Sequence, residues 1–362
     1  MQSVADSEHD QTTPPPATLS EPGQPRQDLR REVTQKLIEA MEAGNTPWQR
    51  PWSAQSLRPQ NGVTHNAYRG INRLLLSLAG QEFGDGRWVT YAQAAANGWS
   101  VKRGAKGHMV VKLLDFGEAS GAAGHAEEEK PRHETQASGA DGAAGALGKR
   151  FGLKRYWVFN AEQVEGMPGL ATQPAQPEFD PVQRAENVMQ ALKEKTGLLI
   201  MHGAAHACYV PAVDEVRVPH KKFFHSPYEY YATALHECGH STLSDKRLDR
   251  RDALGKRFGD AAYSMEELRA ELCSTYLAAE TGVSHHAGQD TEAAKRHLGN
   301  HAAYLKSWIE VLKKDSLAIF AAAKDADLMA TYLIDLERNW SAMKEHSEWV
   351  REFDGQGMVA MR

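Results

Sequence analysis

The sequence predicts an α+β fold, in which a small α+β domain is followed by a mostly helical domain. Two runs rich in β-branched and aromatic residues, 108–114 and 155–160, lie in the first half of the 362-residue chain, and we expect them to pair as a hairpin. In the second half, apolar residues recur at helical spacing almost without interruption from Ser226 to about Lys344. The stretch 166–181 between these halves is punctuated by proline and is typical of an interdomain linker.

Three helices are expected before the first β run. Apolar residues recur every four positions from Leu29 to Met41 and Gly44 follows them, which predicts a helix with a glycine stop. The stretches 70–80 and 90–98 predict two shorter helices, each closed by a glycine.

The second half opens with one helix and several strands. Residues 182–197 have helical spacing and end in a glycine. Three short runs with turn residues between them, 198–203, 206–211 and 214–219, are candidate strands. Helices should make up most of the chain from there on, and no internal repeat is evident.

These patterns, together with two stretches that lack periodicity, divide the chain into five parts. The first 26 residues are rich in Pro, Gln and Ser, and 118–148 is rich in Gly, Ala and Glu. We expect a disordered tail at 1–26, a first domain at 27–165 that contains a mobile loop at 118–148, a linker at 166–181, a second domain at 182–345 and a C-terminal tail at 346–362.

The composition is that of an ordinary globular protein, with 41% hydrophobic and 25% charged residues. No apolar run approaches the roughly 18 residues of a membrane span, and the polar N-terminus lacks the apolar core of a secretion signal. Cys208, Cys238 and Cys273 are too few for a disulfide framework. We therefore expect a cytoplasmic protein without a membrane partner.

Positive charge is concentrated in the first domain. Between Arg30 and Lys112 the chain has twelve basic and five acidic residues, although its overall net charge is −5. Such asymmetry suggests a region that meets phosphate groups. A solvated surface that happens to be basic would give the same count.

The segment LHECGHST contains a pattern that binds metals in many hydrolases. Ser226 and Glu229 form a capping box that predicts a helix from that point. On this helix His236 and His240 project from one face, and two imidazole nitrogens from one rigid element can hold one Zn²⁺. Glu237 lies about 100° round the helix and is placed to act as general base on a metal-bound water. The motif alone is also compatible with two solvent-exposed histidines.

A third ligand is expected from the helix predicted at 264–282. Glu267 and Glu271 lie one turn apart and share a face with small residues, which would let this helix approach the histidine helix closely. The arrangement resembles the gluzincin pattern, which implies that Glu267 ligates the metal and Glu271 hydrogen-bonds a ligand histidine. Two alternatives stay open: Ser264 and Glu267 also read as a capping box, and Glu266 is a neighbouring candidate ligand.

Several blocks, in order, resemble the ArdC-type antirestriction proteins of conjugative plasmids and the related N-terminal part of TraC-type plasmid primases. In the first domain they are TPWQRPW (46–52), YRGINRLLL (68–76), RWVTYAQAAANGWSVKRGAKGHMVV (87–111) and RYWVFNAEQVEG (155–166). In the second they are LHECGHST, EELRAELCSTYLAAETG and NHAAYLKSWIEVLKKDSLAIFAAAKDA (300–326). The tail and the loop 118–148 depart from the family pattern.

The resemblance implies a single-stranded-DNA-binding first domain and a zincin-like metallopeptidase second domain. Aromatic faces beside cations are what single-strand binding uses. The residues that supply them in the matching blocks are Trp48, Arg50, Trp52, Tyr68, Arg69, Lys102, Arg103 and Lys106. The two tryptophans fit a buried core equally well.

Three functions are compatible with these features. The first is an antirestriction protein that escorts the single-stranded DNA of a mobile element and carries a zinc-dependent peptidase-like site. The second is a dedicated metallopeptidase that cleaves a host protein and uses DNA only for localisation. The third is a DNA-binding protein whose metal site is structural. Mn²⁺ or Co²⁺ suits the same ligands as Zn²⁺. His301 and Tyr304 are the candidates for stabilising an oxyanion, and whether the site turns over a peptide stays open.

Overall fold

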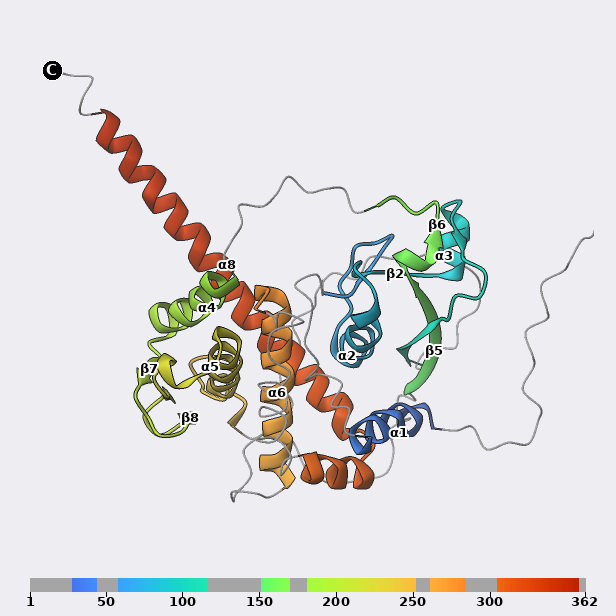
Figure 1. Cartoon of the computed structure of the whole chain (residues 1–362), viewed down its shortest axis with the longest axis horizontal. Coiled ribbons are helices and arrows are strands. Elements are labelled where there is room, and N and C mark those ends of the chain that lie inside the picture. Colours follow the sequence, from blue (N-terminus) through green and yellow to red (C-terminus); the bar gives the residue numbers. More distant parts are fainter. Residues whose placement is uncertain are drawn as a thin grey trace, which may run out of the picture.

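The structure is a computed structural model that describes residues 28–43, 58–115, 151–169, 181–251, 261–283 and 305–357. It confirms the predicted α+β class, with most of the strands in the first half and most of the helices in the second (Figure 1). The predicted tail 1–26 and loop 118–148 lie outside these residues, as does most of the linker 166–181.

The first half is built on a four-stranded sheet. In chain order its elements are α1 (Leu29–Glu42), β1 (Gln60–Asn61), α2 (Gly70–Ala79), β2 (Arg87–Thr90), α3 (Tyr91–Ala96), β3 (Ser100–Val101), β4 (His108–Asp115), β5 (Phe151–Asn160) and β6 (Val164–Glu165). The sheet order is β1-β2-β5-β4, and β3 pairs with β6 in a separate two-stranded sheet.

The expected hairpin partners are confirmed, because β4 and β5 pair antiparallel from His108 opposite Val158 to Asp115 opposite Phe151. The remaining edge of β4 is covered by α2. The Asn72 side chain donates to the Val111 carbonyl at 2.7 Å and accepts from the Val111 N–H at 2.8 Å. This pair of bonds satisfies the backbone groups that an edge strand leaves free and fixes α2 against the sheet.

The second half packs a small sheet against long helices. Its elements are α4 (Pro181–Thr196), β7 (Leu199–His202), β8 (Cys208–Val210), β9 (Glu215–Val218), α5 (Pro227–Ser241), α6 (Ala261–Thr281) and α8 (Ala318–Gly357). Residues 305–314 are also helical. All three predicted strands are present, in the order β7-β9-β8, which leaves β8 at an edge.

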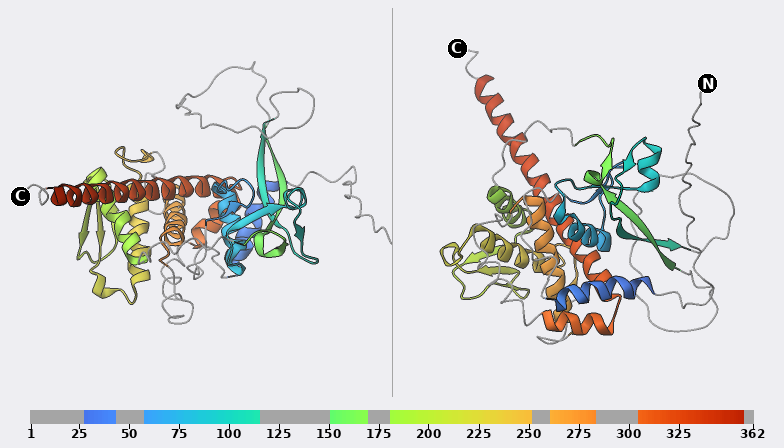
Figure 2. Two further views of the ribbon diagram at one scale, coloured as in Figure 1. Left: turned by 90° about the horizontal axis from the view of Figure 1, so that it is seen from above. Right: turned by 45° about the vertical axis from the view of Figure 1, so that its right-hand side comes forward.

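Helix α8 lies between the two halves and packs on both (Figure 1). One continuous cluster of buried side chains contains Leu37 of α1 and Leu74 of α2 together with Leu235 of α5, Leu272 of α6 and Leu333 of α8. The two halves therefore share a hydrophobic core. The far end of α8 projects beyond the body of the molecule and stays helical to Gly357, through the first part of the stretch expected to be a tail (Figure 2).

Buried ion pairs reinforce this junction. The Arg73 guanidinium of α2, 2% exposed, reaches Asp327 of α8 at 2.7 Å and Glu280 of α6 at 3.0 Å. It also lies 4.1 Å from the centroid of the Tyr276 ring. Arg58 pairs with the same two carboxylates at 3.5 and 3.6 Å. The helix that carries Glu267 is thus tied directly to the first half of the chain.

Within the described ranges, no helix combines the length and the apolar character that crossing a lipid bilayer requires.

Candidate metal centre

The start of α5 sets the direction in which the two histidines point. The Ser226 hydroxyl accepts a hydrogen bond from the Glu229 N–H at 3.2 Å, so the predicted N-cap is confirmed. The Glu229 carboxylate accepts a hydrogen bond from the His225 N–H at 2.9 Å, and not from the Ser226 N–H as a capping box requires. Because the first helical residue is fixed, His236 and His240 lie two turns or more further along on the same face.

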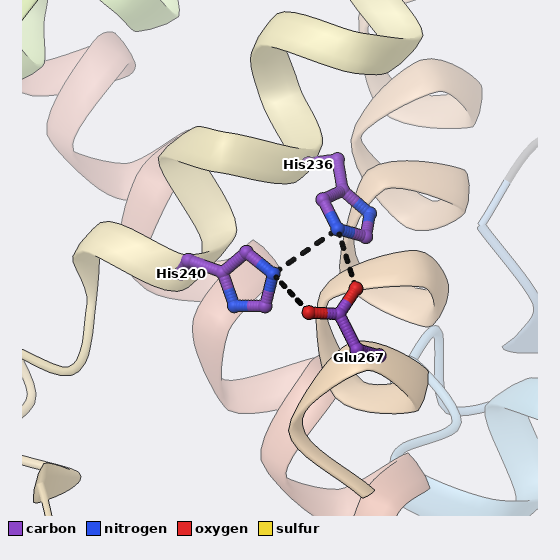
Figure 3. Close-up of side chains that lie close together, drawn as sticks. All are labelled: His236, His240 and Glu267. Atoms are coloured by element: carbon purple, nitrogen blue, oxygen red, sulfur yellow. Dashed lines mark hydrogen bonds and ion pairs between the residues drawn. The ribbon is translucent and has the colours of Figure 1, made fainter. Parts of the chain in front are cut away.

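Helix α6 lies close against α5, as its small residues predict. Ala270 and Ala278 are buried, and the Ser274 hydroxyl donates to the Ala232 carbonyl of α5 at 2.8 Å. Small side chains on this face let the two helix backbones approach. The close approach carries the carboxylates of α6 to the imidazoles of α5 (Figure 3).

Three side chains converge from these two helices (Figure 3). The Nε2 atoms of His236 and His240 are 3.1 Å apart. The two carboxylate oxygens of Glu267 lie 3.5 Å from these nitrogens, Oε2 from His236 and Oε1 from His240. The two histidine side chains are 12% exposed and that of Glu267 is 11% exposed. Each residue therefore offers one donor atom to a common point that is shielded from bulk water.

The spacing of these donors fits a divalent metal. Ligand atoms at about 2.0–2.2 Å from a tetrahedral ion are separated by roughly 3.3–3.5 Å. The donor separations in this cluster, 3.1 and 3.5 Å, lie close to that range. Two imidazoles and one carboxylate are also the ligand set of hydrolytic zinc sites that keep a fourth position open. Among the described residues, this is the one group that meets the geometric requirements for holding a metal ion.

A carboxylate faces the other ring nitrogen of each histidine. Glu271 Oε2 lies 3.5 Å from Nδ1 of His236, and Glu266 Oε1 lies 3.3 Å from Nδ1 of His240. Glu266 is in turn held by Arg250, whose two terminal nitrogens reach its oxygens at 3.0 Å. A proton on Nδ1 of each ring satisfies these contacts and leaves both Nε2 lone pairs directed at the cluster.

The carboxylates favour positive charge at this point of the molecule. Burial by itself lowers the pKa of His236, but Glu267 and Glu271 outweigh it and raise this pKa well above its ordinary value. In the same way Glu266 and Glu267 overcome burial and raise the pKa of His240 to about 9. Burial would raise the pKa of Glu267, yet the two histidines hold it well below its usual range. Surroundings that stabilise protons on both imidazoles also stabilise a cation.

The structure separates the alternatives that the sequence left open for the α6 carboxylates. Helix α6 begins at Ala261, so Ser264 lies inside it and the capping-box explanation for Glu267 is wrong. Glu266 faces Nδ1 of His240 and Arg250, away from the Nε2 atoms. Glu267 is the α6 carboxylate that faces both Nε2 atoms.

Glu237 borders an open pocket of about 290 Å³ beside the cluster. The pocket is also lined by Glu267 and His240, by Cys208 and Tyr209 of the edge strand β8, and by Leu243, Tyr263 and Pro211. Glu237 itself is 7% exposed. The pocket therefore places one carboxylate, one face of the candidate metal site and one strand edge around a common space.

The predicted DNA-contact residues occupy different surroundings. Trp48, Arg50 and Trp52 lie outside the described residues, as do His301 and Tyr304. Tyr68 packs against the cluster around Trp88, and burial raises the pKa of its hydroxyl. Arg69 is exposed at the start of α2. The remaining three, Lys102, Arg103 and Lys106, are exposed together on the turn between β3 and β4.

Sequence reasoning missed two features near these residues. The orienting carboxylate Glu266 was weighed only as a ligand, and its partner Arg250 stands 16 residues away in the chain. Trp157 was assigned to a strand without a further role, although its ring is half exposed. The signal in the sequence that points to it is the RYWVFN block in which it lies, with Arg155 beside two other aromatic residues.

Both halves match known families. Residues 27–159 match the N-terminal domain of the anti-restriction factor ArdC, and residues 186–325 match the zincin-like metallopeptidase family. A DNA primase TraC of Escherichia coli is 37% identical over 322 residues, which are 86% of this chain and 28% of the primase. A second TraC primase is 36% identical over 20% of its length. The chain thus spans between a fifth and a third of these primases.

Other relatives match over nearly their whole length. The uncharacterised protein y4eC of Sinorhizobium fredii is 35% identical, and the match covers 86% of this chain and 94% of that protein. The metal-free crystal structure of the antirestriction ArdC protein from plasmid R388 superposes with a TM-score of 0.60 and 32% identity, over 86% of this chain and 98% of that one. Its Mn(II)-bound structure gives the same TM-score at 31% identity. With an ArdC N-terminal domain followed by a zincin-like domain, the chain belongs to the ArdC family of antirestriction proteins.

Proposed function

We propose that this chain is an antirestriction protein that binds the single-stranded DNA of a mobile element and holds a divalent metal in a peptidase-like centre. The observation that carries the second part is the convergence of His236 Nε2, His240 Nε2 and Glu267 on one shielded point. Family membership supports the first part, as does the excess of basic residues in the first half. The domain limits 27–165 and 182–345 belong to the same proposal.

His236, His240 and Glu267 would hold the ion. The plasmid R388 relative is known in a Mn(II)-bound form, and the same three donors suit Zn²⁺, Mn²⁺ and Co²⁺. A divalent ion in such a site supplies Lewis acidity towards water and carbonyl groups. Glu271 and Glu266 would keep the two imidazoles in the tautomer and orientation that ligation needs.

Glu237 would act as the general base. Its carboxylate lies beside the cluster, at the wall of the pocket, where it can accept a proton from a water that attacks a carbonyl. The same carboxyl group can then return this proton to the leaving amine. Burial keeps the carboxylate away from competing bulk water.

The pocket also suits an extended peptide. Among the described residues, strand β8 pairs with β9 on one side and with no strand on the other, so the backbone groups of that side are available to a peptide strand. Cys208 and Tyr209 of this strand line the pocket together with Glu237. A peptide paired with β8 would thus pass the candidate metal site, which favours a second function for the chain: a metallopeptidase that cleaves a protein.

The two functions separate in a variant that keeps the metal ligands. Glu237→Gln removes the general base, and Glu310→Gln removes the same charge from an exposed helical position as the matched control. Metal content is measured on both proteins, and protection of unmodified conjugative DNA is measured in a restricting host. Protection that survives Glu237→Gln with the metal still bound supports an escort function without proteolysis. Protection lost with the metal retained supports the metallopeptidase.

DNA binding by the native chain is tested on its own. Fluorescence anisotropy with a labelled oligothymidylate measures the affinity. We expect this affinity to fall steeply as salt rises from about 50 to about 200 mM. No binding at low salt, or an affinity that does not respond to salt, would exclude the DNA-binding part of the proposal.

A further inference from the structure

Trp157 is the most exposed of the tryptophans whose side chains the structure describes. Trp88 and Trp308 are at most 1% exposed, whereas Trp157 is 49% exposed. It lies on β5, an inner strand of the four-stranded sheet with β2 on one side and β4 on the other. An aromatic ring of this size in the middle of a sheet is normally covered, so its exposure calls for a reason.

The exposure of Trp157 follows from the way helices cover this face of the sheet. Leu153, Arg155, Trp157 and Phe159 alternate along β5 and so share one face. At one end Leu153 packs against the main core and Arg155 forms an ion pair with Glu32 of α1. At the other end Phe159 packs against the cluster that contains Ala94 of α3. Trp157 therefore lies between the part of this face that contacts α1 and the part that contacts α3, and we call this exposed surface the Trp157 strip.

A second exposed aromatic residue adjoins the same strand pairing. Thr90 of β2 pairs with Val158 of β5, and the next residue, Tyr91, is the first residue of α3. Tyr91 is 67% exposed. On the opposite side Met109 of β4 pairs with Trp157. Two exposed aromatic residues, Tyr91 and Trp157, are thus the chain neighbours of the paired residues Thr90 and Val158.

One cation lies near the Trp157 ring, and a basic turn leads up to the same residue. The Arg155 guanidinium lies 5.9 Å from its centroid, although Glu32 partly neutralises that charge. The turn that carries Lys102, Arg103 and Lys106 leads directly into Gly107, where an added Cβ would lie 3.3 Å from Trp157 Cβ. A glycine at this position lets the basic turn come close against the tryptophan.

The basic turn is held in one conformation. The Ala105 N–H donates to the Lys102 carbonyl at 3.0 Å, and Gly104 takes a left-handed φ of +81° that few other residues adopt. The Gln163 side chain donates to the Lys106 carbonyl at 3.1 Å, and the Lys102 N–H donates to the Gln163 carbonyl at 2.9 Å. The exposed cations are therefore displayed from a fixed backbone, which lowers the entropic cost of binding an anionic chain.

We infer that this strip binds single-stranded DNA, with an unpaired base stacked on Trp157 and the adjoining phosphates beside Arg103 and Lys106. Base stacking on a sheet aromatic requires a base that is free of its partner, which favours a single strand over a duplex. The charge of Arg103 and Lys106 is complementary to phosphate, and one or two exposed rings offer far less apolar area than a stable protein interface needs. The inference rests on the proposed DNA-binding function and assigns it a surface.

The test compares two exposed aromatic side chains that each lie near a cation. Trp157→Leu keeps an apolar side chain and removes the large ring, while Phe223→Leu does the same at a 66%-exposed position beside Lys222 in the second half. Binding of a labelled oligothymidylate is measured by anisotropy over a range of salt concentrations. Trp157→Leu should weaken binding about 5- to 150-fold with an unchanged salt slope, and Phe223→Leu should leave both unchanged.

Two further variants distinguish a loss of base stacking from a loss of DNA binding caused by misfolding. Trp157→Phe keeps a stacking ring and should recover most of the affinity, which a folding defect would not allow. Arg103→Gln should instead lower the salt slope by about 0.7, the share of one phosphate contact on a single strand.

The possible failures have different meanings. Normal DNA binding by Trp157→Leu would overturn this surface assignment and leave the proposed function intact. An equal loss in Phe223→Leu would also overturn it. Preference for a duplex, or capture of a protein in place of DNA by the Trp157 strip, would contradict the single-strand assignment. Absence of any DNA binding by the native chain would instead remove the proposed function on which the inference rests.

Discussion

The metal cluster and the Trp157 strip are built in opposite ways. In the cluster, two imidazoles and three α6 carboxylates are all at most 12% exposed and come from two helices packed against each other. In the strip, a half-exposed ring lies beside solvated cations from one strand and one turn. Charges in the first region have each other as their main partners. Charges in the second have water and, by our inference, phosphate.

This difference in burial sets how strongly each region should respond to change. Charges removed from water interact at low effective dielectric and are poorly screened by salt. Exposed charges contribute little individually and lose their effect as salt rises. Substitution of a single charge should therefore be severe and insensitive to salt in the cluster, and mild and sensitive to salt in the strip.

The largest effect is expected from loss of a ligand. Structural zinc sites gain about 10–16 kcal/mol from four ligands, so His240→Ala should weaken metal binding on the order of 10³-fold. His206→Ala removes an exposed imidazole and should not change the affinity. The metal affinity of both variants is measured by titration with Zn²⁺ in competition with a chelator. Equal affinity in the two variants would mean that His240 is not a ligand.

The junction between the halves comes next. Asp327→Asn leaves the buried Arg73 with one carboxylate fewer and should lower the free energy of unfolding by about 3 kcal/mol. Asp335→Asn makes the same change on the same helix at a 59%-exposed position and should cost less than about 1 kcal/mol. Chemical denaturation, monitored by circular dichroism, gives the free energy of unfolding of both variants. Similar losses would show that burial of this ion pair does not matter to stability.

The orienting carboxylates should have a smaller effect on the metal. Glu271→Gln keeps the size of the side chain and removes the charge opposite His236, so metal affinity should fall about 10- to 100-fold. The effect should persist at high salt, because the pair is buried. Competition titrations at low and high salt provide the measurement, with Glu310→Gln as the exposed control. An unchanged affinity would leave Glu271 as a packing residue.

The smallest effect belongs to the exposed cations of the strip. Lys106→Gln should weaken oligothymidylate binding only a few-fold at low salt, and the difference should vanish as salt rises. Metal binding should stay unchanged in the same protein. A loss of DNA affinity that persists at high salt would contradict this expectation. It would show that the charge of Lys106 is as poorly screened by salt as the buried charges of the metal cluster.

Much of the cluster was predictable because it follows helix geometry. The spacing of His236 and His240 on a helix begun by Ser226 fixes their common face. The small residues beside Glu267 and Glu271 predicted the close helix contact that brings the two acids to the histidines. Strands β4, β5, β7, β8 and β9 were found from their composition, and the pairing of β4 with β5 as a hairpin was expected. The short strands β1, β2, β3 and β6 were not predicted.

What the sequence did not reveal depends on contacts between distant segments. The role of Glu266 requires Arg250, which follows α5 and is brought to α6 only by the packing of the helices. The capping alternative for Glu267 persisted because local sequence does not fix where a helix begins, and α6 starts a turn before Ser264. The exposure of Trp157 depends on where α1 and α3 end over the sheet, which strand periodicity does not encode.

The central claim is that α5 and α6 together form a divalent metal site. A crystal structure of the protein grown with Mn(II), with anomalous data that locate manganese, tests it most directly. We expect one strong anomalous peak about 2.0–2.3 Å from His236 Nε2, His240 Nε2 and a Glu267 oxygen. Absence of a peak between these three side chains, or a peak bound by other residues, would contradict the claim.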